Sequence, residues 1–410
     1  MFFRAIARYN CSASINVYMI RSSPITRRET IKELMRMSIS LKKVSMIGDE
    51  VKASKFIEKL MGKNPVFICT IANTKTAMVP GITVAGAAPE IVKCTPPADA
   101  ELIYYGKCKC IPGIPATPDG KPTPAIITLS ALRLADIPLF IVEAGCEVKP
   151  YAPYISIGIQ SPGDNIQKGK ALDRNAVENA VNYAELIGKN FAKLADYLVL
   201  GESIPAGTTT ALGVLMSLGI DARGKVSSSM PENPHEIKNR VVEEGMKAAG
   251  IKIGSLRDDP IGAICTLGDP MMVSVLGMTL GAAQKVPVIL AGGTQMAAIV
   301  ALISRIRPDI LRNVAIGTTR YIVEDKTSSI SWLIDQSASI PIFGADPGLS
   351  ESKKEGLRAY AHGFVREGVG AGGATLAAML KSNGKITTDL IRVEIERNYE
   401  KIVESRLKNP

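Results

Sequence analysis

The feature of this sequence with the clearest chemical potential is a carboxylate embedded in glycine. Residues 366–374 read REGVGAGGA, so Glu367 is followed by Gly368, Gly370 and two further glycines. Because glycine has no side chain, a flat molecule can approach such a carboxylate closely. Partial burial raises the pKa of a carboxyl group towards neutrality, where it acts well as a general base. A solvated Glu on a flexible surface loop has the same pattern, so both interpretations stay open.

A second segment, residues 201–210 (GESIPAGTTT), combines an acid with a potential anion-binding turn. Glu202 opens the segment, and Gly207 permits a tight turn. Thr208 and Thr209 then provide hydroxyl and amide donors where a helix is predicted to begin, and such amide groups bind phosphate. Threonine is also an ordinary N-cap residue, so the segment alone predicts either phosphate binding or simple helix capping.

A third segment, residues 290–295 (LAGGTQ), again places a glycine turn between a predicted strand and a predicted helix. Gly292 and Gly293 would let a phosphate or a ribose approach the backbone closely. The segment is not a Walker loop, because no Gly-Lys-Ser/Thr follows. It also lacks the third glycine and the downstream acid of the dinucleotide-binding fingerprint, which disfavours a nicotinamide-dependent oxidoreductase.

Between these two turns, residues 227–238 (SSSMPENPHEIK) form a serine-rich loop that leads into a predicted helix. Lys238 lies in the first turns of that helix, where its ammonium group could bind a phosphate as a point charge. It is equally consistent with a surface lysine on a helix rich in Glu and Lys. His235 has no Ser or Asp partner pattern around it, so we assign it no catalytic role.

Two segments nearer the N-terminus are candidates for the walls of a pocket. Residues 82–90 (ITVAGAAPE) and 95–101 (TPPADAE) are dominated by small residues. That composition suits either a pocket for a flat apolar ring or tight packing of a loop. A proline-rich stretch at residues 96–124 predicts a long irregular excursion, and loops of that length in a compact domain are usually functional.

The elements that must position these segments are predicted to alternate between strands and helices. Continuous apolar runs, typical of strands buried on both faces of a parallel sheet, lie at Val66–Ile71, Ile137–Val142, Asp196–Leu200, Val286–Leu290, Val314–Gly317 and Ile340–Phe343. Helical periodicity predicts helices at Asn175–Leu194, Thr208–Leu218, Pro234–Ala249, Gln295–Arg305 and Glu351–His362. This alternation predicts a doubly wound α/β fold with a mainly parallel sheet, helices on both faces and a smaller helical part from the chain ends. In such a sheet ligands bind beyond the carboxyl ends of the strands, where the segments described above are expected.

The positive charge of the chain is concentrated in its first residues. Residues 1–45 contain nine Lys or Arg and two Glu, so they carry +7 of the net charge of +10. A nucleic-acid footprint would lie on the folded domain, so we predict no nucleic-acid partner. The basic segment has the composition of a transit peptide, but it also fits a later translation start, at Met37 or Met46, or a basic helix over Arg27–Ser40. The predicted domains are therefore a basic extension (1–45), an α/β domain (46–385) and a C-terminal helix (386–410).

Cysteine usage and hydropathy predict a cytoplasmic protein without a membrane segment. No uninterrupted apolar run is long enough to cross a bilayer. The seven cysteines are odd in number and mostly lie in apolar contexts, which is typical of reduced, intracellular proteins. Cys94, Cys108 and Cys110 lack the spacing of a zinc knuckle, and the chain has two histidines, so no metal is predicted.

Taken together and in this order, these segments resemble the nicotinate-nucleotide–dimethylbenzimidazole phosphoribosyltransferase family and look closest to its archaeal branch. The resemblance runs from roughly residue 60 to 385 and is most specific at 201–210, 234–238 (PHEIK), the Gly292-Gly293 turn and 367–370 (EGVG). It implies that Glu367 removes the ring N–H proton of an incoming benzimidazole and that Glu202 lies across the site. It further implies substrate binding by Gly207, Thr208, Thr209, Lys238, Gly292, Gly293, Gly368 and Gly370, with Thr318 and Thr319 at the nicotinate carboxylate.

The activity implied by the resemblance is transfer of phosphoribose from nicotinate mononucleotide to a benzimidazole-type base, with inversion at the anomeric carbon. The product is an α-ribazole phosphate for the lower ligand of cobalamin. No cofactor is implied, and a homo-oligomer, with a dimer as the simplest form, is expected. Bacterial members have Gly-x-Gly-Asn where this chain reads IPAG at 204–207, which leaves the turn geometry and the phosphate contacts there open. The base-binding N-terminal region of bacterial members has no counterpart in this sequence, which leaves the accepted base open. The alternative is a non-catalytic nucleotide-binding relative that acts as a sensor or assembly partner and would not need Glu367.

Overall fold

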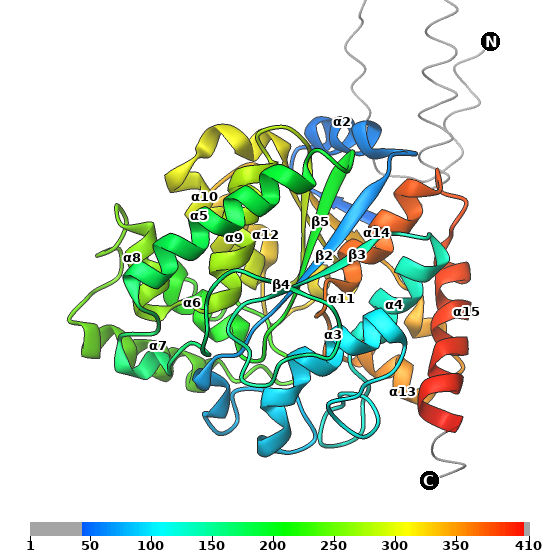
Figure 1. Ribbon diagram of the computed structural model, residues 1–410, viewed down its shortest axis with the longest axis horizontal. Helices are drawn as coiled ribbons and strands as arrows, with labels where there is room; N and C mark the ends of the chain where they lie inside the picture. Colours follow the sequence, from blue (N-terminus) through cyan, green and yellow to red (C-terminus); the bar gives the residue numbers. More distant parts are fainter. Residues whose placement is uncertain (1–42, 406–410) are drawn as a thin grey trace, which may run out of the picture. The chain divides into compact units, whose positions relative to one another are not determined.

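The computed structural model describes residues 43–405, which form one eight-stranded sheet with helices on both faces (Figure 1). The strand order is β1-β8-β7-β6-β5-β2-β3-β4; β1 runs antiparallel to β8, and every other neighbouring pair is parallel. The predicted doubly wound, mainly parallel α/β fold is confirmed. The strands are β1 (Val44–Ile47), β2 (Pro65–Ile71), β3 (Leu139–Glu143), β4 (Ile155–Ser156), β5 (Tyr197–Ser203), β6 (Val288–Ala291), β7 (Val314–Thr319) and β8 (Ile342–Ala345).

The six predicted strands are all present, as β2, β3, β5, β6, β7 and β8. Every residue of β2 and β5 is buried, which explains why the sequence shows continuous apolar runs rather than alternation. The chain passes from β2 to β3 and β4 on one side and then returns to β5 on the other side of β2. The topological switch point of the sheet therefore lies between β2 and β5, where ligands bind in doubly wound folds.

Two layers of helices cover the sheet. Figure 1 shows α5, α9 and α10 on one side and α14, α4 and α15 on the other. Helix α14 contacts β5, β6, β7 and β8, so it crosses the centre of the sheet. The helices are α2 (Glu50–Leu60), α3 (Thr95–Tyr105), α4 (Ala125–Leu134), α5 (Arg174–Phe191), α6 (Gly207–Ser217), α7 (His235–Ala249), α8 (Pro260–Leu267), α9 (Pro270–Ala282), α10 (Gln295–Ile306), α11 (Arg320–Val323), α12 (Ile330–Asp335), α13 (Glu355–Arg358), α14 (Ala371–Lys381) and α15 (Thr388–Tyr399).

Four of the five predicted helices are present, as α5, α6, α7 and α10. The prediction of one helix over Glu351–His362 is wrong, because that segment is divided into the four-residue α13 and two single 3₁₀ turns. Ser352 interrupts it by accepting the N–H of Lys354 with its hydroxyl, a local bond that competes with helix formation. The hydroxyl of Tyr360 is also engaged elsewhere, since it donates to two backbone carbonyls of the 115–124 loop.

The predicted irregular excursion at 96–124 is partly wrong, because its first third is helical. Helix α3 begins at Thr95, and Pro96 and Pro97 occupy its first turn. Proline is tolerated there, since the N–H groups of a first turn have no partner within the helix. Only the remainder of the stretch, from Gly106 onwards, is a loop.

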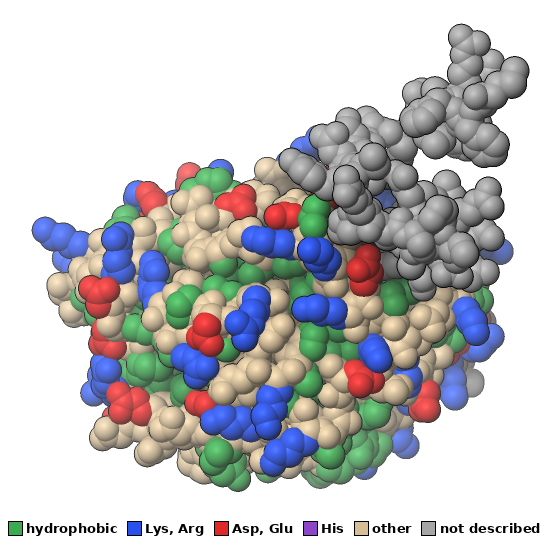
Figure 2. All heavy atoms as spheres, turned by 90° about the horizontal axis from the view of Figure 1, so that it is seen from above, with side chains coloured by type: hydrophobic (Ala, Val, Ile, Leu, Met, Phe, Trp, Pro, Cys, Tyr) green, Lys and Arg blue, Asp and Glu red, His purple; other side chains and the backbone are tan. Residues whose placement is uncertain are grey.

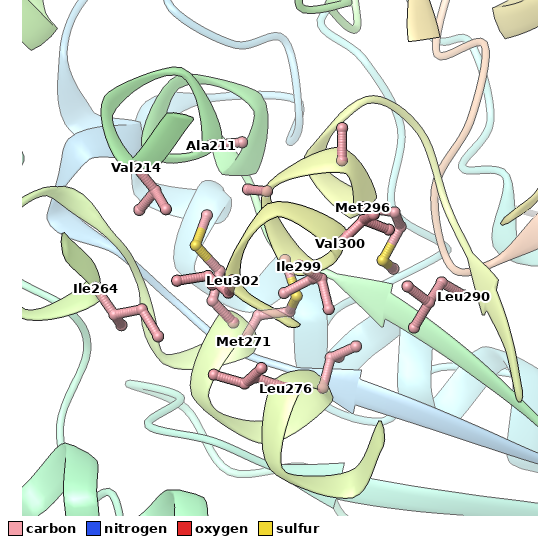
Figure 3. Close-up of a cluster of buried hydrophobic side chains, with 14 of the residues drawn as sticks. Ala211, Val214, Ile264, Met271, Leu276, Leu290, Met296, Ile299, Val300 and Leu302 are labelled. Carbon is pink, nitrogen blue, oxygen red and sulfur yellow. The ribbon is translucent and has the colours of Figure 1, made fainter. Parts of the chain in front are cut away.

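A hydrophobic core lies between the sheet and the layer of α6, α8, α9 and α10. Figure 3 shows side chains from these four helices and from β6 meeting in one cluster, including Met271, Leu276, Leu290 and Ile299. All thirteen residues of α9 are buried. The Ala-, Gly- and Met-rich composition of α9 thus reflects a buried helix packed on the sheet and on α5.

The predicted extension at residues 1–45, with its helix over Arg27–Ser40, lies outside the described residues apart from residue 43 and the start of β1. At the other end, α15 is followed by a π-helical turn, Glu400–Glu404.

Acidic and basic side chains are intermixed on the face of the molecule drawn in Figure 2. Within residues 43–405, no helix has the length and apolar character that would let it span a membrane.

Candidate functional site

A pocket opens at the carboxyl ends of the central strands. Its empty space, counted out to the open solvent, is about 880 Å³. It lies at the switch point between β2 and β5, because the segments that follow these two strands form much of its lining. The lining consists of residues 82–86, Thr95, Asp99, 115–117, 121–124, 202–208, 227–229, Gly293, Gln295, Ile322, Val365 and 367–369.

Glu367 lines this pocket with its carboxylate held at the N-terminus of α14. The backbone N–H of Thr319 donates to Oε2 at 2.7 Å, and the N–H of Gly372 donates at 3.2 Å. The N–H of Gly368 and the hydroxyl of Thr318 add longer bonds, at 3.2 and 3.4 Å. Burial raises the pKa of Glu367 to about 7, although these hydrogen bonds favour the ionised form and oppose the shift. The carboxyl group can therefore gain or lose a proton near neutral pH.

The glycines that follow Glu367 serve to bring α14 against the sheet. A Cβ on Gly372 would overlap the carbonyl group of Thr318, and one on Gly370 would lie 2.9 Å from the Cα of Gly201. Among these glycines, only Gly368 lines the pocket. We expected the glycine run to clear space for a substrate. In the structure, the glycines after Gly368 instead allow α14 to pack closely on β5, β6 and β7.

Glu202, near the end of β5, lines the same pocket and is almost fully buried. Its carboxyl group accepts a hydrogen bond from the side-chain amide of Gln295, at the start of α10. Its backbone carbonyl accepts the N–H of Val369 at 2.8 Å, which ties β5 to the Glu367 loop. Burial raises the pKa of Glu202 well above its usual value, and the nearby charge of Glu367 raises it further. Both causes favour the protonated form of Glu202.

A third acid, Asp99 on α3, also lines the pocket. It belongs to the segment 95–101, which was predicted as a candidate pocket wall, but no separate role was predicted for its carboxyl group. The hydroxyl groups of Thr123 and Ser203 each donate to its carboxylate at 2.7 Å. Burial raises the pKa of Asp99 to about 7, and the two hydrogen bonds partly oppose that shift.

Lys238 is fully buried and lies behind the pocket instead of lining it. Its ammonium group donates to Thr208 Oγ1 and Asn233 Oδ1, both at 3.2 Å, and to the backbone carbonyl of Ser227. Burial lowers the pKa of Lys238 to about 7, and the charge of Asp325 opposes that shift. Lys238 therefore fastens Thr208 to the serine-rich loop that forms one wall of the pocket.

The two predicted anion-binding turns meet in this pocket. Thr208, at the start of α6, and Gly293, before α10, both line it. The turns are joined through the serine-rich loop, because the N–H of Ser227 donates to the hydroxyl of Thr294 at 2.8 Å. The N-termini of two helices longer than two turns thus face one cavity, an arrangement that favours a bound anion.

The predicted site residues fall into two groups. Those that line the pocket are Glu202, Glu367, Gly207, Thr208, Gly293 and Gly368. The others support the lining from behind, namely Thr209, Lys238, Gly292, Thr318, Thr319 and Gly370. The hydroxyl of Thr318 and the N–H of Thr319 donate to the carboxylate of Glu367, and the hydroxyl of Thr319 donates to the backbone carbonyl of Arg366. These three donors are therefore engaged within the protein.

The sequence is similar to a phosphoribosyltransferase family model and to archaeal proteins. A family model described as phosphoribosyltransferase matches residues 125–320. A UPF0284 protein of Archaeoglobus fulgidus is 50% identical over 337 residues, covering 82% of this chain and 94% of the relative. A UPF0284 protein of Methanopyrus kandleri is 42% identical over 358 residues, covering 87% of this chain and 93% of the relative.

A solved structure has a similar fold at low sequence identity. The crystal structure of nicotinate-nucleotide-dimethylbenzimidazole phosphoribosyltransferase from Thermus thermophilus aligns with a TM-score of 0.54 and 12% identity. The alignment covers 91% of this chain and 98% of the other. At this identity the similarity concerns the fold, and it extends over nearly the whole of both chains.

Proposed function

The chain belongs to the phosphoribosyltransferase family that includes these archaeal UPF0284 proteins, and we propose that it transfers phosphoribose from nicotinate mononucleotide to a benzimidazole-type base. The observation that carries the proposal is the carboxylate of Glu367, held in the pocket by backbone amides with a pKa near neutrality. A base of that strength suits removal of a ring N–H proton. The archaeal relatives' names state no reaction, so the proposal rests on the site.

In the proposed reaction, Glu367 accepts the ring proton of the incoming base as the ring nitrogen attacks the anomeric carbon. The bond from that carbon to the pyridinium nitrogen of nicotinate breaks, and its electron pair leaves with neutral pyridine. Attack on the opposite face of the ribose inverts the β-anomer to the α-anomer. Holding both rings on either side of one ribose supplies a large share of the rate through proximity.

Glu202 is assigned a different role in this proposal, that of a protonated partner, because burial and the charge of Glu367 both raise its pKa. A neutral Glu202 does not repel the ionised Glu367 across the pocket, and its hydrogen-bond partner Gln295 fixes its orientation. The carboxylate of Glu367 is then free to accept the ring proton, which removes the positive charge that would otherwise develop on the attacking ring. The acid pair thus divides into one base and one neutral hydrogen-bonding group.

The phosphate of the mononucleotide is proposed to bind at the turns before α6 and α10. Thr208 and Gly293 line the pocket there and offer hydroxyl and amide donors. Lys238 acts through Thr208 as a positioning residue, since its ammonium group is already surrounded by three oxygen atoms. Thr209, Gly292 and Gly370 are likewise proposed to shape these turns from behind.

Adding a methyl group to the floor of the pocket should block the nucleotide without unfolding the protein. A Cβ on Gly293 would lie 3.0 Å from Gln295 Oε1, 3.5 Å from Ser227 Oγ and 3.7 Å from Glu367 Cβ. All of these are side-chain atoms, so we expect Gly293→Ala to change the free energy of unfolding by less than about 1 kcal/mol. The Kd for nicotinate mononucleotide should rise about 10-fold or more, because the methyl group occupies ligand space. Calorimetric titration measures the Kd, and urea unfolding measures the free energy of unfolding. A Kd equal to that of wild type would mean that the nucleotide does not bind beside Gly293.

The pH dependence of the reaction tests the role of Glu367. Its pKa is raised to about 7, so the carboxyl group is mostly protonated, and inactive as a base, below that pH. We expect kcat/KM with dimethylbenzimidazole to rise with pH from 6 and to level off above about 7.5. Nicotinate release measured from pH 6 to 9 in buffers of constant ionic strength gives this profile. A rate that does not change between pH 6 and 8 would contradict a general base with this pKa.

A further inference from the structure

A rigid hairpin within the proline-rich stretch closes one side of the pocket. Ala116 and Pro122 form a β-bridge, and the N–H of Thr117 donates to the carbonyl of Lys121 at 2.9 Å. The N–H of Lys121 in turn donates to the hydroxyl of Thr117 at 2.9 Å. The backbone of Lys121 is thus held by two hydrogen bonds to Thr117, one through its carbonyl and one through its N–H.

The base of this hairpin is anchored to two other elements of the site. The hydroxyl of Tyr360 donates to the carbonyls of Pro122 and Thr123, at 2.7 and 2.9 Å. The hydroxyl of Thr123 donates to the carboxylate of Asp99 on α3. Backbone that is held at so many points presents its side chains in a defined direction, which a binding residue requires.

Lys121 is the single Lys or Arg among the described residues that line the pocket, which it shares with the carboxyl groups of Asp99, Glu202 and Glu367. It makes no ion pair with any residue in the range 43–405. Its ammonium group instead lies 5.9 Å from the centre of the Phe364 ring, and the side chain is half-buried. An unpaired cation at such a position is available to a ligand.

We propose that Lys121 binds an anionic group of the mononucleotide, either the 5′-phosphate or the carboxylate of the pyridine ring. This inference rests on the proposed function, which supplies a substrate with two anionic groups. Lys238, the lysine that was expected to bind the phosphate, instead donates its hydrogen bonds to three oxygen atoms of the protein. Lys121 is therefore the cation that offsets the acid-lined wall of the pocket when the anionic substrate enters.

The test is calorimetric binding of three ligands to the full chain and to three variants. Nicotinate mononucleotide carries both anionic groups, nicotinamide mononucleotide lacks the carboxylate, and nicotinate riboside lacks the phosphate. Lys121→Met removes the charge, and Lys121→Arg keeps it. Lys225→Met is the matched control, because Lys225 is also half-buried, lies over the ring of Trp332 and does not line the pocket.

We expect Lys121→Met to raise the Kd for nicotinate mononucleotide by about 10- to 100-fold, with Lys121→Arg close to wild type. If the partner is the carboxylate, nicotinamide mononucleotide will bind wild type and Lys121→Met alike. If the partner is the phosphate, nicotinate riboside will bind wild type and Lys121→Met with the same affinity. Equal affinity of Lys121→Met and Lys225→Met for nicotinate mononucleotide would overturn the inference about Lys121 but leave the proposed function standing. A wild-type chain that binds no mononucleotide would overturn the proposed function and the inference with it.

Discussion

Replacing Glu367 by Gln is expected to lower the rate of nicotinate release with dimethylbenzimidazole by about 10²- to 10⁴-fold. Gln has nearly the same shape as Glu and its amide oxygen can still accept the N–H groups of Thr319 and Gly372. The loop and the start of α14 should therefore keep their conformation. What is lost is the ability to accept a proton, so kcat should fall while the Kd for nicotinate mononucleotide stays within about threefold of wild type.

The control for this substitution is Glu324→Gln. Glu324 is an exposed residue that pairs with Arg320 and does not line the pocket. Single-turnover measurements of nicotinate release, combined with calorimetric binding, separate the chemical step from substrate affinity. A Glu367→Gln variant that retains more than about a third of the wild-type kcat would show that another group removes the proton.

The second large effect is expected for Gly372→Ala, which should destabilise the fold and disable the site together. A Cβ at this position would overlap the carbonyl group of Thr318, which is backbone and cannot rotate away. Helix α14 would have to move from β7, and such overpacking costs about 1–3 kcal/mol or more of the free energy of unfolding. The N–H groups that hold the Glu367 carboxylate come from both of these elements, so catalysis should also be lost.

Gly293→Ala is the matched comparison for this prediction. Both changes add one methyl group beside Glu367, but the methyl group at 293 contacts side-chain atoms and the one at 372 meets backbone. Urea unfolding should therefore show a lower midpoint for Gly372→Ala and a midpoint close to wild type for Gly293→Ala. Equal midpoints would mean that α14 and β7 are not in the close contact that holds Glu367 in place.

The fold was predictable because buried parallel strands have a strong signal. β2 and β5 begin as continuous apolar runs, and β5 ends in the polar pair Glu202 and Ser203, so Glu202 was correctly placed at the carboxyl end of a strand. The edge strands β1 and β4 were missed, since strands of four and two partly exposed residues have no such run. The helix over Glu351–His362 failed for another reason: side-chain bonds from Ser352 and Tyr360 overrode its local periodicity.

The site was predictable where local sequence determines local structure. A glycine turn between a strand and a helix is a short-range pattern that indicated Thr208 and Gly293, and the run of glycines indicated Glu367. All three residues line one pocket. The burial of Lys238 depends on α7 packing against α6, which no local pattern records. Asp99 and Lys121 face the pocket because α3 and the hairpin fold over the ends of distant strands. The sequence indicated the segments that hold these residues, 95–101 as a pocket wall and 96–124 as a functional loop, but not which side chains face the pocket, because that depends on the tertiary structure.

The measurement that tests the central claim most directly is the identity of the product. Purified protein would be incubated with nicotinate mononucleotide and dimethylbenzimidazole, and nicotinate release and riboside formation would be followed in the same samples by chromatography and NMR. We expect equal amounts of nicotinate and of a benzimidazole riboside phosphate in the α-configuration, with no release of nicotinate in the absence of the base. Tight binding of the mononucleotide without any nicotinate release, with each benzimidazole and purine offered, would contradict the account and identify a non-catalytic nucleotide-binding protein.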